Sequence, residues 1–383
     1  MSSSARICPK CGVVLPSTVA EGLCPRCLYA QLDDAIAWEG AEPQAEGSRV
    51  EPVSSEGRSA REFGDYELLE EIGEGGMGVV YRARQKSLDR GVAVKVVKLG
   101  MDTRKIIARF EVERQALALM DHPAIARVFD SGATRTGRPY FAMELIRGVK
   151  ITNYCDEHLL SNRQRLDLFI QVCHAVQHAH QKGIIHRDLK PSNILVTELE
   201  GRPFPKIIDF GIAKATESRL TDETLVTLAG QFLGTPAYLS PEQAEWGSVD
   251  IDTRSDIYSL GVLLYELLTG CLPFEPRSPA KASLEEVRRT IREAEPVKPS
   301  TRLMQEIVAT GASPPRSSVA GEKSRRADSR RFLNEVRGDL DWIVMKCLEK
   351  NRARRYETAS GLAADIQRHL NNEPITARPP SRL

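Results

Sequence analysis

Hydrophobic and polar residues begin to alternate at Phe63, after a stretch with little apolar periodicity. A period of two predicts three strands over "YELLEEIGEGGMGVVYRARQ" and "GVAVKVVKL", and two more around the glycine-bearing turn of "ARVFDSGATRTGRPYFAMEL". Between these groups, "RKIIARFEVERQALALM" has the spacing of an amphipathic helix. The pattern therefore predicts a strand-rich lobe interrupted by one helix.

After about residue 150 the pattern becomes mostly helical, which predicts an α+β chain with two lobes and no internal repeats. The longest apolar run, "LGVLLYELL", has the length of a buried helix and falls short of the ~20 residues that span a membrane. We expect these divisions: a cysteine-pair segment 1–29, an acidic linker 30–62, a folded domain 63–371 with lobes 63–147 and 148–371, a basic insert 277–331 and a tail 372–383.

The composition limits the classes of protein to which this chain can belong. The 383 residues are 27% charged and 41% hydrophobic, as in soluble globular proteins, and the length suggests two or three domains. With 53 basic and 52 acidic residues, no overall charge favours nucleic acid or an anionic membrane, so neither partner is expected. The start, "MSSSARICPK", is not a secretory signal. Four of the eight cysteines are scattered in apolar surroundings, which indicates a reducing cytoplasm.

The segment "IGEGGMGVV" contains a G-x-G-x-x-G motif formed by Gly73, Gly75 and Gly78. Glycines let the backbone approach phosphate oxygens and direct N–H groups at them. Here the motif joins two predicted strands, not a strand and a helix, which argues against a dinucleotide-binding unit. Alone it is weak evidence, because many tight hairpins are glycine-rich.

Seventeen residues after Gly78, "VAVK" places a cation, Lys95, on the neighbouring predicted strand. The alternative is a solvated strand lysine, with Lys98 equally placed; the order of glycine loop and V-A-V-K favours Lys95. A buried lysine needs a counter-charge, and the predicted helix offers Glu111 and Glu113. We favour Glu113, because its helical spacing puts it beside the apolar face.

The segment "HRDLKPSN" gathers Asp188, Lys190 and Asn193 on one short loop, and "IIDFG" follows with Asp209. Phosphoryl transfer needs in-line positioning, metal ions and a group that accepts a hydroxyl proton. Asp188 could take that proton and Lys190 could contact the γ-phosphate. The oxygens of Asn193 and Asp209 suit Mg²⁺ or Mn²⁺. The loop therefore predicts phosphate transfer to an alcohol.

Together, "GEGGMG", "VAVK", "HRDLKPSN" and "DFG" resemble the protein-kinase catalytic domain over about residues 66–371, in the family's order. "DLKPSN" and "GTPAYLSPEQ" resemble the serine/threonine class, and the whole resembles the bacterial Hanks-type kinases. The resemblance implies a bilobal fold, Mg·ATP as cofactor, protein substrates and a bridging role for Thr235 between Asp188 and Lys190. It also implies nucleotide contacts from Ile72, Val80, Ala93, Met143 as gatekeeper, the backbone of Glu144 and Ile146, and Leu195; several of these would equally suit a plain core.

Where the family has "APE", this chain has Ser240-Pro241-Glu242. The resemblance implies a structural ion pair between Glu242 and Arg355. It also implies that Asp256 braces the backbone of the catalytic loop.

Arg187, directly before Asp188, resembles the arginine of kinases that are switched on by phosphorylation of the activation loop. Thr224 and Thr227 are the candidate phosphorylation sites, and self-association for autophosphorylation is expected. The alternatives are solvated threonines and a structural arginine.

Two CxxC pairs, Cys8/Cys11 and Cys24/Cys27, lie twelve residues apart and resemble a zinc ribbon. Four thiolates suit tetrahedral Zn²⁺, and metal would supply folding energy that so short a segment lacks. Two redox disulfides are the alternative. The ribbon's few basic residues disfavour a nucleic-acid role.

The stretch 277–331 holds thirteen basic and seven acidic residues, a net charge of +6. "SLEEVRRTIREAEP" looks helical, and "TGASPPRSSVAGEKSRRADSRR" has the composition of a disordered segment. A solvated insertion is favoured over a docking surface for acidic partners.

An active serine/threonine kinase is the favoured hypothesis, because Lys95, Asp188, Asn193 and Asp209 are all present. The alternatives are a silent ATP-binding scaffold and a zinc-ribbon adaptor that carries a regulatory kinase domain. Similar bacterial kinases often continue into a membrane span and a sensor, neither of which this sequence contains. We therefore expect a soluble chain or a fragment.

Overall fold

The computed structural model describes residues 6–7, 14–15, 62–75, 78–97, 120–134, 137–210, 236–245, 251–274, 284–310 and 332–378. The chain forms two compact units, Met1–Ser54 and Ser55–Leu383. In the first unit, β1 (Arg6–Ile7) pairs antiparallel with β2 (Val14–Leu15). The predicted zinc ligands Cys8, Cys11, Cys24 and Cys27 and nearly all of the predicted linker lie outside the described residues.

The first lobe of the second unit is a six-stranded antiparallel sheet with the order β3-β4-β5-β6-β8-β7. The strands are β3 (Glu62–Phe63), β4 (Tyr66–Gly75), β5 (Gly78–Gln85), β6 (Arg90–Val97), β7 (Val128–Ala133) and β8 (Pro139–Glu144). The five strands predicted from the alternating pattern are therefore confirmed, and the predicted helix falls on residues that are not described.

One small core holds this sheet together. It consists of Tyr66, Ala83, Val92, Val94, Val96, Tyr140 and Ala142. At its edge the Tyr66 hydroxyl donates to Asp130 Oδ2 over 2.9 Å, so the buried phenol is satisfied.

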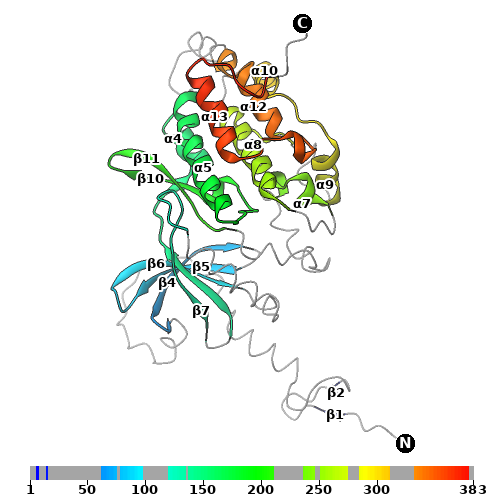
Figure 1. The fold of residues 1–383 in the computed structure, drawn as a ribbon. Coiled ribbons are helices and arrows are strands. Elements are labelled where there is room, and N and C mark those ends of the chain that lie inside the picture. The colour runs from blue at the N-terminus through cyan, green and yellow to red at the C-terminus, as the bar shows by residue number, and fades with distance from the viewer. Residues whose placement is uncertain are drawn as a thin grey trace, which may run out of the picture. The chain divides into compact units, whose positions relative to one another are not determined.

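The second lobe is helical, as predicted (Figure 1). Its helices are α4 (Ile151–Glu157), α5 (Asn162–Gln181), α7 (Pro241–Ala244), α8 (Thr253–Thr269), α9 (Leu284–Glu293), α10 (Pro299–Thr310), α12 (Asp339–Cys347) and α13 (Ala359–Leu370). The apolar run "LGVLLYELL" forms part of α8, which is buried almost throughout its length and packs against α5, α10 and α12. The sequence sets its ends: the Asp252 side chain caps the first turn, and Gly270 adopts the left-handed φ of 76° that ends the helix.

A three-stranded sheet of order β11-β10-β9 flanks the helices, and its strand β10 begins directly after the "HRDLKPSN" segment. Its strands are β9 (Val149–Lys150), β10 (Ile194–Leu199) and β11 (Arg202–Ile207). Residue Ile207 forms a parallel bridge with Ile125 of the first lobe: Ile207 N–H donates to Ala124 O and Ala126 N–H donates to Ile207 O, each over 2.9 Å. Backbone bonds therefore tie β11 to the loop before β7.

Within the predicted insert, the helix expected over "SLEEVRRTIREAEP" is present as α9. The pattern had not singled out α10, which tertiary contacts hold in place: Leu303 is buried, and Ser300 donates through N–H and Oγ to Asp341 over 2.9 and 2.6 Å. Residues 311–331 lie outside the description.

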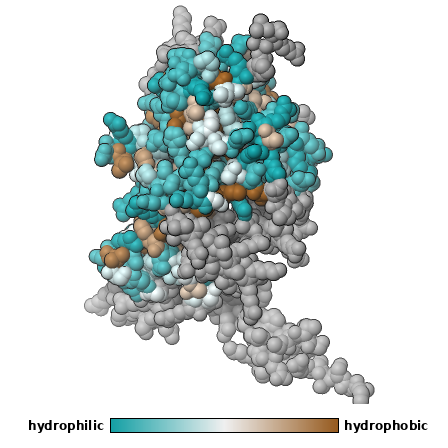
Figure 2. Space-filling model, viewed as in Figure 1, coloured by the Kyte–Doolittle hydropathy of each residue, from teal (hydrophilic) through white to brown (hydrophobic). Residues whose placement is uncertain are grey.

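No helix among the described residues is long and apolar enough to cross a membrane. The coloured part of the face drawn in Figure 2 is mostly hydrophilic, with hydrophobic residues scattered over it.

Candidate active site

The residues from Ile184 to Asn193 form the loop between α5 and β10, and they hold the predicted catalytic group together. Lys190 Nζ lies 2.9 Å from Asp188 Oδ2. The Asn193 amide donates to the Asp188 main-chain oxygen over 2.8 Å and to its Oδ2 over 3.1 Å. A cation and an amide therefore fix the carboxylate of Asp188.

Asp256 of α8 is completely buried, and its carboxylate is hydrogen-bonded to the backbone of this loop. Its carboxylate accepts the N–H groups of His186 and Arg187, each over 2.8 Å, and His180 Nε2 lies 2.7 Å from it. Burial alone would raise the pKa of Asp256, but the bonds from His180 and the His186 backbone outweigh burial and hold the pKa below its usual value. The predicted bracing role of Asp256 is confirmed.

Asp209 follows β11 and reaches the first lobe through an ion pair with Lys95 of β6. The Ile208 N–H donates to Asn193 O over 2.9 Å, which places the two candidate metal ligands on neighbouring backbone segments. Asp209 has a left-handed φ of 63°, a conformation that only surrounding contacts hold for a non-glycine residue. The predicted partner of Lys95, Glu113, lies outside the described residues.

The donor set fits a magnesium ion. The amide nitrogen of Asn193 donates to Asp188, and its amide oxygen accepts from Ser192 Oγ over 3.3 Å, which leaves one lone pair of that oxygen. Asp209 supplies a carboxylate. These are the hard oxygen ligands that Mg²⁺ takes, usually together with water and phosphate. Within the described ranges no cluster of three or more histidine, cysteine or acidic side chains could hold a metal by itself.

The three glycines of the motif lie at the facing ends of β4 and β5 and have different surroundings. A Cβ at Gly73 or Gly75 would meet nothing within 4 Å. A Cβ at Gly78 would clash with the main-chain oxygen of Val96. The first two glycines therefore border open space, and the third lets β5 approach β6.

The predicted adenine contacts lie on strands of both lobes. Ala93 is opposite Met143 in the register of β6 and β8, and Val80 is opposite Lys95 in β5 and β6. Leu195 lies in β10, opposite Lys150 of β9. Ile72 is 47% exposed on β4.

Glu144, the last residue of β8, and Ile146, two residues beyond it, were predicted to offer backbone groups. The Glu144 N–H already donates to Arg127 O over 2.8 Å, so this N–H is not available to a ligand. The Glu144 carboxylate accepts from Lys206 of β11, over 2.7 and 2.8 Å to its two oxygens. Ile146 is half-buried.

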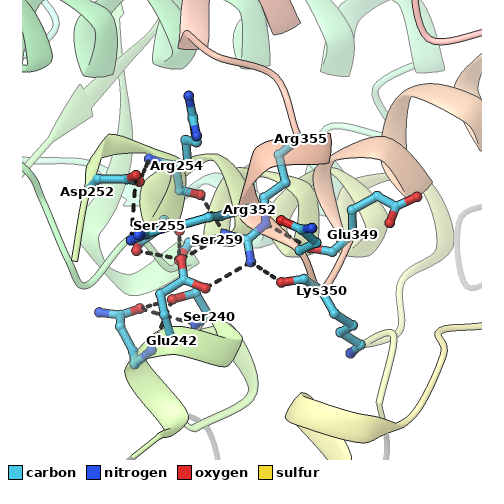
Figure 3. Close-up of polar contacts among 12 residues, drawn as sticks. Ser240, Glu242, Asp252, Arg254, Ser255, Ser259, Glu349, Lys350, Arg352 and Arg355 are labelled. Carbon is cyan, nitrogen blue, oxygen red and sulfur yellow. Dashed lines mark hydrogen bonds and ion pairs between the residues drawn. The ribbon is translucent and has the colours of Figure 1, made fainter. Parts of the chain in front are cut away.

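The predicted pair of Glu242 and Arg355 is present and buried (Figure 3). The guanidinium contacts the two carboxylate oxygens over 2.7 and 2.9 Å, and Ser255 Oγ donates to one of them over 2.6 Å. The remaining N–H groups of Arg355 donate to the main-chain oxygens of Arg254, Glu349 and Lys350. Bonds from Arg355 and Ser255 lower the pKa of Glu242 in spite of burial, which by itself would raise it.

Thr235 and the candidate phosphorylation sites Thr224 and Thr227 lie outside the described residues. Three residues that contact the site were not predicted from the sequence: His180, Lys206 and Gln243. Their partners lie 56 to 76 residues away in the chain, and no local pattern points to them.

The fold and this constellation of residues define a class of protein, and comparison with known proteins agrees. The family model described as "Protein kinase domain" matches residues 66–369. Serine/threonine-protein kinase PknB of Mycobacterium tuberculosis is 38% identical over 318 residues, which are 82% of this chain and 44% of that protein. Serine/threonine-protein kinase pkn3 of Myxococcus xanthus is 37% identical over 299 residues, 77% of this chain and 48% of that protein.

Among solved structures, the kinase domain of PknI from Mycobacterium tuberculosis has the same fold, with a TM-score of 0.54 at 22% identity. The match covers 81% of this chain and 97% of that one. This chain belongs to the protein kinase family. It spans less than half the length of the two curated relatives named above.

Proposed function

We propose that this chain is a serine/threonine protein kinase that transfers the γ-phosphate of ATP to hydroxyl groups of proteins. The observation that carries the proposal is the catalytic loop, where Lys190 and Asn193 hold the carboxylate of Asp188 beside the Lys95–Asp209 pair. The serine/threonine class rests on "DLKPSN" and on the names of the relatives.

In the proposed mechanism, Asp188 orients the substrate hydroxyl and takes its proton as the new O–P bond forms and the bond to ADP breaks. Lys190 then neutralises charge on the γ-phosphate, and Lys95 contacts the inner phosphates. Thr235 bridges Asp188 and Lys190. A bound Mg²⁺ would supply charge neutralisation, held by Asn193 and Asp209. Glu113 is the proposed second partner of Lys95.

The proposed nucleotide site lies between the lobes. The backbone of Gly73 and Gly75 approaches the phosphates in this proposal, and the open space that a Cβ at either position would meet is compatible with it. Val80 and Ala93 cover the adenine from one side and Leu195 from the other. Ile72, Gly78, Met143 and the backbone of Glu144 and Ile146 complete the site.

The proposed switch is phosphorylation of Thr224 or Thr227, by a second copy of the chain. The observation that favours it is Arg187: within the described part of the chain, no ion pair involves its guanidinium. A phosphothreonine would pair with this arginine and order the loop.

The test is phosphate incorporation by the purified chain with Mg·ATP, read by mass spectrometry. Asp188→Asn should lower the rate by about 100-fold or more, because general bases contribute about 10²–10⁴. The exposed carboxylate of Asp167 provides a matched control, and Asp167→Asn should leave the rate unchanged. Equal phosphorylation by the parent chain and Asp188→Asn would contradict the proposed base; ATP binding without turnover in the parent would favour the scaffold.

The proposed organisation keeps the divisions of the sequence: a ribbon over 1–29, a linker over 30–62 and the kinase domain over 63–371. The cytoplasm is the proposed compartment, because the described thiols of Cys173 and Cys347 are buried and form no disulfide.

The ribbon is proposed to hold Zn²⁺ through Cys8, Cys11, Cys24 and Cys27. Dialysis of the full chain against a chelator should release about one equivalent of zinc. Replacing Cys8 and Cys24 by serine should abolish that zinc, whereas replacing the buried Cys155 and Cys173 by alanine should not. A metal-free parent chain would contradict the ribbon.

A further inference from the structure

The short helix α7 begins where this chain departs from the "APE" of its family. Ser240 caps the helix: the Gln243 N–H donates to Ser240 Oγ over 3.4 Å. In return, Gln243 Oε1 accepts from the Ser240 N–H over 3.1 Å and from its hydroxyl over 3.2 Å. This reciprocal arrangement is a capping box, and it occupies the oxygen of the Gln243 amide.

The nitrogen of the same amide points to the catalytic loop. Gln243 Nε2 donates to the main-chain oxygen of Arg187 over 2.8 Å. The orientation of the amide follows from its neighbours, because a rotated amide would place its oxygen against the Arg187 oxygen and its nitrogen against the Ser240 N–H. One side chain therefore joins the cap of α7 to the residue before Asp188.

Arg187 needs such support. Its φ of 64° is left-handed, a conformation that is unfavourable for a residue with a Cβ. Its N–H donates to Asp256 Oδ1 over 2.8 Å. The next peptide group is held at both ends: Gln243 binds its oxygen, and the Asp188 N–H donates to His186 Nδ1 over 3.2 Å. Because a peptide group is planar, these two bonds set the direction in which the chain enters Asp188.

We propose that Gln243 is a positioning residue for Asp188. It acts through its hydrogen bond to the Arg187 carbonyl. This bond connects the end of the activation segment to the backbone that holds Asp188, the proposed base. Glu242, beside it, is fixed to the helical lobe by Arg355, so the position of Gln243 is set by a rigid anchor. The inference rests on the proposed kinase activity.

If Gln243 only capped α7, a variant that keeps the cap would keep its activity; if Gln243 positions Asp188, that variant would lose activity. Gln243→Glu distinguishes these two roles. A carboxylate still accepts from Ser240, so the capping box remains, but it has no N–H for the Arg187 oxygen. Ser240→Ala does the reverse: it removes the cap hydroxyl and keeps the amide.

The chain contains a matched control. Ser161 and Gln164 form the same capping box at the start of α5, with Gln164 Oε1 accepting from the Ser161 N–H over 2.9 Å. Gln164 is exposed. Gln164→Glu therefore makes the same change of charge in the same motif, at a site whose described bonds do not include the catalytic loop.

The experiment measures kcat and the KM for ATP with dephosphorylated casein as acceptor, together with the melting temperature of each full-length variant. Gln243→Glu should lower kcat about 10-fold, the effect of losing one partly buried hydrogen bond, with KM for ATP and melting temperature close to those of the parent. Ser240→Ala should lower the melting temperature and leave kcat within about twofold of the parent. Gln164→Glu should change neither.

Two results would overturn the inference while the parent chain is active and Asp188→Asn is not. One is an unchanged kcat in Gln243→Glu. The other is a fall in kcat that Gln164→Glu reproduces, or that follows the melting temperature across all three variants. An inactive parent chain would instead remove the proposed function and, with it, this inference.

Discussion

The glycine motif combines residues whose surroundings differ: Gly73 and Gly75 border open space, and Gly78 packs against β6. The motif predicts a loop that approaches phosphate, and the open space around Gly73 and Gly75 is compatible with that function. Gly78 is required by the sheet, because Val96 of β6 leaves no room for a Cβ. Structural and functional demands on a single motif can thus be assigned residue by residue.

Replacing Gly78 by alanine should lower the free energy of unfolding by about 1–3 kcal/mol, because the clash is with backbone and β5 must shift away from β6. Replacing Gly75 by alanine should change that free energy by about 0.5 kcal/mol or less and raise the KM for ATP. Chemical denaturation and ATP titration of the two variants check this contrast. A stable Gly78→Ala, or an unchanged KM in Gly75→Ala, would contradict the respective assignment.

At the scale of elements, α7, α8 and the loop after α12 are joined by the ion pair of Glu242 and Arg355. Arg355 is fully buried and Glu242 nearly so, with side-chain exposures of 0% and 12%. Such a pair adds little compared with apolar packing, but the loss of one partner leaves an uncompensated charge. Every described N–H of the Arg355 guanidinium has an acceptor, so its orientation is set. The pair therefore holds Glu242, at the end of the activation segment, in one position.

Arg355→Met should lower the free energy of unfolding at pH 7 by about 3–5 kcal/mol. The pKa of Glu242 is lowered by folding from its ordinary value of 4.5, so the pair's contribution is complete above about pH 4.5 and is lost as pH falls through the lower pKa of the folded state. The difference between parent and variant should therefore shrink in acid.

Denaturation curves between pH 7 and pH 3 test this. The neighbouring Arg354, whose side chain is 70% exposed, provides the control, and Arg354→Met should have little effect at any pH. A difference that stays constant down to pH 3 would contradict the assignment of the pH dependence to Glu242.

At the scale of the whole kinase unit, three of the described contacts between the lobes come from β11 and the residues directly after it. Ile207 bridges to Ile125, Lys206 pairs with Glu144, and Asp209 pairs with Lys95. The strand that leads to the candidate metal ligand thus also contacts the first lobe. A change at Glu144, the last residue of β8, reaches Lys206, which lies three residues before Asp209 in the chain.

Lys206→Met, Glu144→Gln and the double variant should show a coupling of about 0.5–1 kcal/mol in the free energy of unfolding, a modest value because the side chains are 16% and 30% exposed. The pair of Arg82 and Glu70 is the control, because its side chains are 39% and 54% exposed and it lies within one sheet. Its coupling should be smaller. Strict additivity at Lys206 and Glu144 would contradict a link between the lobes.

Much of the site could be predicted from local signals. The strands follow from alternation, and Lys95, Asp188, Asn193 and Asp209 follow from motifs whose spacing is short. The orientation of Asp188 could not be predicted, because it depends on Gln243, 55 residues further along the chain, and on Asp256 of α8. The helix α10 was also missed, because its stability comes from packing against α8 and α12 and not from its own pattern.

Local patterns in the sequence suffice to predict most of the strands and helices, the class of the fold and the residue types at the catalytic loop, because each of these signals lies within a short window of residues. Which of these residues support one another depends on the tertiary structure. Hydrogen bonds between distant segments, such as that from Gln243 to Arg187, depend on how the helical lobe packs, and that packing minimises the exposed apolar surface of the whole chain.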